Sequence, residues 1–82
     1  MGRKYLKLSK KDLETIREEN RRAGEEKIKI IDGFPYEKLI DFRTKQEAKE
    51  FIKRHSFLRK LCYYRIARDS WTGWWGVYIL KK

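Results

Sequence analysis

Aromatic and basic side chains are interleaved near the C-terminus, a combination that suits nucleic-acid binding. The segments from Cys62 to Asp69 and from Trp74 to Leu80 are rich in the β-branched and aromatic residues typical of strands, and a tight connection separates them. An aromatic ring can stack on a nucleobase, and an arginine can pair with a phosphate or stack itself. This predicted hairpin is therefore the first candidate for a functional surface.

Cross-strand pairing predicts which side chains of this hairpin share a face. A four-residue loop over 70–73 and a two-residue loop over 71–72 give the same pairing, whereas a loop of three or five residues would exchange the faces. One face, with Tyr64, Ile66 and Val77, is expected to join the core. The candidate stacking and anchoring residues on the other face are Tyr63, Arg65, Trp74 and Tyr78. Trp71, at the tip of the loop, is a further candidate contact.

Positive charge is concentrated in the second half of the chain. The 82 residues include 22 Lys and Arg against 12 Asp and Glu, which gives a net charge of +10. Residues 1–42 hold eleven basic and nine acidic side chains, whereas residues 43–82 hold eleven basic and only three acidic ones, a surplus of +8. Such asymmetry predicts a polyanionic partner. The predicted phosphate contacts are Lys53, Arg54, Arg59, Lys60 and Arg68.

A row of like charges on the second predicted helix supports this interpretation. Lys45, Lys49 and Lys53 recur every four residues, a spacing that destabilises an isolated helix and that a bound anion would relieve. The alternative is the solvated surface of a heat-stable protein, because the composition is thermophile-like, with abundant Lys, Arg and Glu and only two side-chain amides. Ion-pair networks need acidic partners, which are scarce in this half, so we favour contact with a polyanion.

The residue types do not indicate metal or cofactor chemistry. The chain has one His and one Cys, with no spacing that pairs them as ligands, and no phosphate-binding glycine loop. We expect no metal, no cofactor and no catalytic residues, with His55 packing at the end of an apolar helix face and Cys62 in the core. A metal-independent ribonuclease stays open as an alternative, since His, Tyr and Arg can transfer a proton and stabilise phosphoryl charge.

Local patterns predict a single α+β domain over residues 1–82. One helix is expected between the N-cap Ser9 and Gly24, and another after the capping box of Thr44 and Glu47, while residues 57–61 turn the chain. Asp32-Gly33 is a strong hairpin signal, with Pro35 in the connection. The expected strands are Tyr5 to Leu8, Lys27 to Ile31, Lys38 to Phe42, Cys62 to Asp69 and Trp74 to Leu80.

This (β)αββαββ order predicts an antiparallel sheet with two helices on one face, ferredoxin-like or related, with an added C-terminal strand. The opposite face would be open as a binding platform. Sheet aromatics in this order resemble those of RNA-recognition-motif domains, but the spacing of residues 73–78 does not fit that family's glycine–aromatic signature, so no family is assigned.

The predicted function is nucleic-acid binding without catalysis, with single-stranded RNA or DNA preferred to duplex. The first alternative is a protein-binding module that recognises an acidic partner, or a homodimer through the aromatic sheet face. The chain could be a monomer or a homodimer. No apolar run approaches the length of a membrane span, and the single cysteine fits a reducing compartment, so we expect no membrane partner and a cytoplasmic, intracellular location.

Overall fold

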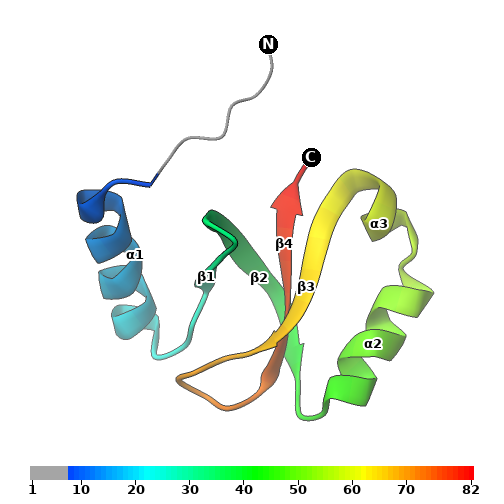
Figure 1. Cartoon of the computed structure of the whole chain (residues 1–82). Coiled ribbons are helices and arrows are strands. Elements are labelled where there is room, and N and C mark those ends of the chain that lie inside the picture. Colours follow the sequence, from blue (N-terminus) through cyan, green and yellow to red (C-terminus); the bar gives the residue numbers. More distant parts are fainter. Residues whose placement is uncertain (1–7) are drawn as a thin grey trace.

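The computed structural model describes residues 8–82 and confirms the α+β class with an antiparallel sheet. The elements in chain order are α1 (Lys10–Ala23), β1 (Ile28–Ile31), β2 (Phe34–Phe42), α2 (Lys45–Arg54), α3 (Phe57–Leu61), β3 (Cys62–Arg68) and β4 (Trp75–Lys81). The strands lie in the order β1-β2-β4-β3 and curl into a half-barrel (Figure 1). β2 therefore pairs directly with β4, and β1 and β3 form the two edges of the sheet.

The first hairpin forms at the predicted turn. Asp32 and Gly33 both have positive φ, 53° and 84°, as a two-residue turn between right-twisted strands requires. β2 begins at Phe34, earlier than expected, so Pro35 lies within the strand and not in the connection. Pro35 is opposite Ile30, one step from the turn-closing pair. Because bonded and non-bonded pairs alternate, its missing N–H is not needed for pairing with β1.

One sheet face packs against α2 and α3 to form the hydrophobic core. Thr44 caps α2 in the predicted capping box, and Ser9 caps α1 in the same way. The segment over 57–61, expected to be a turn, is the short helix α3, which buries Leu58. The buried centre of the core consists of Ala48, Ile52, Leu58 and Val77. The partly buried side chains packed against it are Phe42, Phe51, Tyr64, Ile66 and Ile79.

The predicted register of the last hairpin is confirmed throughout β3 and β4. Cys62 pairs with Lys81, Arg65 with Tyr78 and Arg68 with Trp75. The loop closes through a hydrogen bond of 2.8 Å from the Asp69 amide to the Trp74 carbonyl. The core face is thus the expected one.

The opposite face is not the open platform that the sequence predicted. Tyr78 is fully buried on it, and Tyr36 is only 6% exposed. Curling brings the strands of this face together, and the segments after α1 and between β3 and β4 lie near each other at one end of the sheet (Figure 1). The curl therefore buries the centre of the face that would otherwise have met a ligand.

α1 attaches to the sheet along the β1 edge. The Asn20 amide donates to the Ile28 carbonyl at 2.9 Å and accepts from the Ile28 amide at 3.1 Å, so one side chain satisfies both edge groups of that residue. Figure 1 shows α1 beside β1 and α2 with α3 on the side of β3. The strand expected over residues 5–8 lies outside the described residues except for Leu8, which is not in a strand.

Candidate nucleic-acid interface

Tyr78, predicted to stack on a base, is instead a structural residue. Its hydroxyl donates to the backbone carbonyl of Glu26 at 2.8 Å, and none of its surface is exposed. Burial raises the pKa of this phenol well above its ordinary value. The prediction was wrong because cross-strand pairing identifies the face of a side chain, whereas the curl of the sheet decides whether that face is covered.

Tyr63 and Arg65 remain exposed on this face, but they lie apart from the tryptophans. The Arg65 guanidinium on β3 pairs with Asp32, in the turn of the first hairpin, at 2.8 Å. The Lys82 ammonium lies 5.2 Å from the centre of the Tyr63 ring. Tyr63, Arg65 and Lys82 line one hollow of about 270 Å³. Arg65 is thus already partly neutralised, which weakens its case as the main anchor.

Trp71 lies at a different edge of the molecule from the other candidate residues. Its ring is half-exposed, and it lines a hollow of about 320 Å³ with Leu13, Ile16 and Ile30, between α1 and β1. The loop is held in place, since the Trp71 amide donates to the Asp69 carboxylate at 2.7 Å. Trp71 does not join the remaining candidates.

A groove between α2 and the edge strand β3 brings basic and aromatic side chains together. This α2–β3 groove has a volume of about 210 Å³, and its rim carries one acidic side chain, Glu50. Lys49 and Lys53 line it from the helix, Arg59 from α3 and Tyr64 from the strand. The lining residues are Gln46, Lys49, Glu50, Ile52, Lys53, Arg59, Tyr64 and Ile66. Of the predicted phosphate contacts, Lys53 and Arg59 meet here.

Two adjacent indoles lie beyond one end of the groove, surrounded by cations. The Lys45 ammonium lies 5.4 Å from the Trp75 ring centre and the Arg68 guanidinium 5.8 Å from the same ring. Arg43 lies 5.7 Å from the ring centre of Trp74. We call these five residues the indole cluster. It continues the groove because Lys45 is one helical turn before Lys49, and Arg68 is two residues beyond Ile66 on the same side of β3.

The cations of this region have few acidic partners. Residues 43–82 contain eleven Lys and Arg, and within the part of the chain that the structure describes only Arg65 among them forms an ion pair. The other ion pairs use cations of α1, β1 and β2. Arg54 and Lys60 are exposed on α2 and α3 but do not line the groove. The acidic residues that the structure describes therefore do not neutralise the positive charge of the groove.

Sequence reasoning missed Tyr64 and Trp75 because they belong to the core-facing side of the hairpin. Both are only half-buried: Tyr64 lies on the edge strand β3, and Trp75 is the first residue of β4, next to the loop. The signal that could have found them is the lysine row of α2. It needed to be combined with the residues of β3 and β4 that face the helix.

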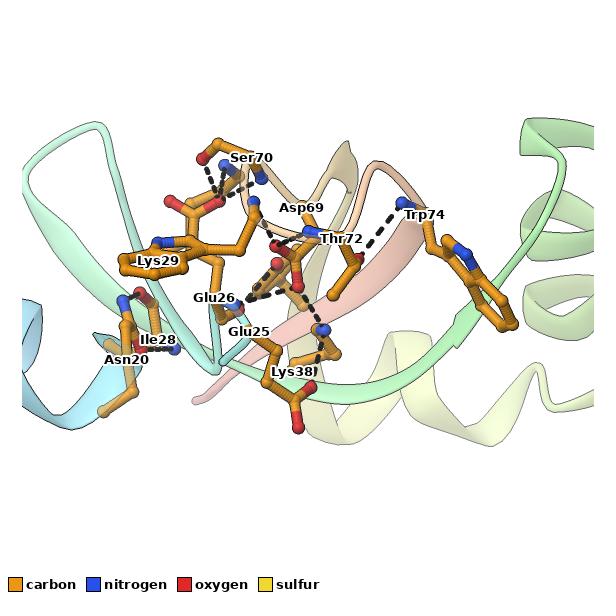
Figure 2. A network of polar contacts seen from close by, with 12 residues as sticks. Asn20, Glu25, Glu26, Ile28, Lys29, Lys38, Asp69, Ser70, Thr72 and Trp74 are labelled. Carbon is orange, nitrogen blue, oxygen red and sulfur yellow. Dashed lines mark hydrogen bonds and ion pairs between the residues drawn. The ribbon is translucent and has the colours of Figure 1, made fainter. Parts of the chain in front are cut away.

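The one cluster of acidic residues among those described holds a lysine. Carboxylate oxygens of Glu25, Asp41 and Asp69 lie within 4.8 Å of one another. The buried Lys38 ammonium lies among them, 2.8 Å from Glu25 and 3.0 Å from Asp41, and it also bonds to Asp69. Figure 2 shows its contacts with Glu25 and Asp69. The ammonium thus supplies the positive charge that these three carboxylates require.

Asp69 is the centre of this network and holds the loop before the indole cluster (Figure 2). Burial opposes its ionisation, but the Lys38 ammonium and three backbone amides outweigh that cost and lower its pKa to about 2. Burial opposes the charged form of Lys38, but its hydrogen bonds to Asp69, Glu25 and Asp41 raise its pKa above the ordinary value. The amides that donate to Asp69 belong to Glu26, Trp71 and Thr72.

His55 and Cys62 lie where the sequence predicted. His55 stacks on Phe51 with ring centres 4.3 Å apart, and its Nδ1 lies 2.9 Å from the Phe51 carbonyl oxygen. Cys62 is a buried free thiol. Neither side chain lines the α2–β3 groove.

Comparisons of this chain with protein-family models, with curated proteins and with solved structures found no match. Among residues 8–82, no helix is long and apolar enough to cross a membrane.

Proposed function

We propose that this protein binds nucleic acid, with single-stranded RNA or DNA preferred to duplex, and without catalysis of its own. The α2–β3 groove, extended by the indole cluster, is the contact surface. The observation that carries the proposal is the set of cations around this groove that have no ion-pair partner among the described residues. A bound polyanion would supply the missing negative charge.

The lysine row has the geometry of a backbone contact. Lys45, Lys49 and Lys53 recur every four residues, so their Cα atoms follow the helix axis at intervals of about 6 Å. That interval is comparable to the distance between successive phosphates of an extended strand. All three side chains are exposed. The row can therefore follow a single strand phosphate by phosphate.

The aromatic groups favour unpaired bases. Tyr64 lines the groove, and Trp74 and Trp75 lie beyond its end. Base stacking on such rings requires bases that are free to leave a duplex. Tyr63 and Arg65 lie across β3 from the groove and would contact only a strand that wraps around this edge.

The test is an equilibrium titration of labelled single strands and duplex at several salt concentrations. We expect affinity to fall steeply with salt. If Lys49 and Lys53 each contact a phosphate, the double variant Lys49→Gln/Lys53→Gln lowers the slope of log Kd against log salt for a single strand by about 1.4. The matched control is Lys10→Gln/Lys11→Gln on α1, which removes the same charge from exposed lysines far from the groove.

Two results would overturn the proposal. Equal reductions of the slope by both double variants would mean that net charge alone, and not the groove, governs binding. Absence of binding to any strand at low salt, together with binding to polyglutamate, would assign the cationic surface to an acidic protein partner.

A further inference from the structure

The indole cluster presents an aromatic ring that the fold does not use. Trp74 is 42% exposed, and its only ring contact in the described part of the chain is Arg43. Its main chain closes the β3–β4 loop, since the Trp74 carbonyl accepts from the Asp69 amide and its own amide donates to Thr72 Oγ1 at 3.2 Å. Any residue except proline could make these backbone contacts. The exposed part of the indole is therefore available to a ligand.

The backbone beside this ring is held in position. Phe42 pairs with Trp75, and Arg43 and Trp74 are the residues next to this pair in the sequence. Arg68 is directly opposite Trp75 on β3, and its Nε donates to the Gly73 carbonyl at 3.0 Å. Figure 2 shows the Trp74 ring pointing away from the buried polar network. The loop thus presents a partly exposed ring with the Arg43 guanidinium beside it.

The composition of the cluster limits what it can bind. Arg43, Lys45 and Arg68 surround two indoles, and no carboxylate among residues 8–82 forms an ion pair with any of the three. A cationic ligand such as a methylated ammonium would be repelled. A ligand with one flat ring and adjacent negative charge fits both parts of the site.

We propose that the indole cluster is a subsite for one unpaired nucleobase and its flanking phosphates. The base stacks on Trp74, and Arg43 beside that ring contacts a flanking phosphate, while Lys45 and Arg68 around the neighbouring Trp75 attract the adjoining strand. This inference rests on the proposed function, and it specifies the ligand as a strand with accessible bases at the end of the groove nearest the start of α2.

The experiment compares two probes with wild type and three variants. One probe is a labelled single strand of about ten nucleotides, within the range that small single-strand binding sites cover, and the other is an abasic strand of the same length. We expect Trp74→Leu to weaken binding of the first probe by at least about fivefold, the factor for loss of one stack, and to leave the abasic strand unaffected. Trp74→Phe should retain most of the affinity.

Trp71→Leu is the matched control, because Trp71 is similarly exposed on the same loop but lies against α1 and β1. It should change neither affinity. Thermal unfolding of each variant establishes that the fold is intact. If wild type binds and Trp74→Leu changes both probes equally or neither, the base subsite is wrong while nucleic-acid binding stands. If wild type binds neither probe, both proposals fail.

Discussion

Replacement of Asp69 by Asn should destabilise the fold, and the loss should disappear in acid. Asp69 is completely buried, and its carboxylate accepts hydrogen bonds from the Lys38 ammonium and from amides on two separate segments. Asn has one acceptor oxygen in place of two, so its NH₂ group would face donors. Lys38 would keep Glu25 and Asp41 as partners.

The magnitude follows from the shifted pKa. Lowering the pKa of Asp69 from 3.8 to about 2 corresponds to about 2 kcal/mol of stability at neutral pH. Breaking a buried charge pair costs about 3 to 5 kcal/mol in general, and the remaining partners of Lys38 reduce that figure. We expect a loss of about 2 to 4 kcal/mol, a lowering of Tm by about 10 to 30 °C for a domain of this size.

The pH dependence gives the decisive comparison. Because the pKa of Asp69 is lower in the folded chain, its contribution is present above the unfolded value of 3.8 and is lost as pH falls towards about 2. Urea unfolding of wild type and Asp69→Asn should differ most near neutrality and converge in acid. Glu37→Gln controls for net charge, because Glu37 is an exposed β2 carboxylate that forms no ion pair with any of residues 8–82. A difference that stays constant with pH would refute the reasoning.

Three further substitutions test a close packing contact, a side chain that bonds to the edge strand and an exposed ion pair. Gly76→Ala would place a Cβ 2.7 Å from Cε2 of the buried, hydrogen-bonded Tyr78 ring, so we expect a loss of about 1 to 3 kcal/mol in thermal unfolding. Asn20→Ala leaves both backbone groups of Ile28 without their partner, which should cost about 2 kcal/mol and speed hydrogen exchange in β1. Asp32→Asn breaks an exposed ion pair and keeps a residue type that tolerates the positive φ of this turn, so its effect on urea unfolding should stay below about 1 kcal/mol.

Local rules predicted much of the fold. The two capping boxes, the Asp32-Gly33 turn and the whole β3–β4 register depend on residues that are close in sequence. The burial of Tyr78 could not be predicted in this way. It depends on sheet curl and on Lys38 meeting Asp69 from 31 positions away, and neither follows from alternation within one hairpin.

Only part of the candidate site could likewise be predicted from the sequence. The composition of residues 43–82 indicates its cations, but which aromatic side chains join them depends on the order of the strands in the sheet. Tyr64 was assigned to the core face, which is correct, yet β3 is an edge strand and leaves this side chain half-exposed. Had β3 been central, Tyr64 would be covered on both sides. Edge position, which the sequence does not encode locally, is what turns a core face into a groove wall.

The partners of the acidic residues favour a binding surface over the surface of a heat-stable protein. The three carboxylates after residue 42 all have other partners: Asp69 bonds to Lys38, Glu47 closes the α2 capping box and Glu50 accepts from Gln46. An ion-pair network needs opposite charges at three- and four-residue spacing, and α1 has such pairs around Glu18. The lysine row of α2 adds repulsion of about a few tenths of a kcal/mol per pair. No ion pair among the described residues offsets that cost, and the one favourable side-chain contact of the row among them is that of Lys45 with the Trp75 ring. This imbalance is the physical reason that we propose a ligand for the row.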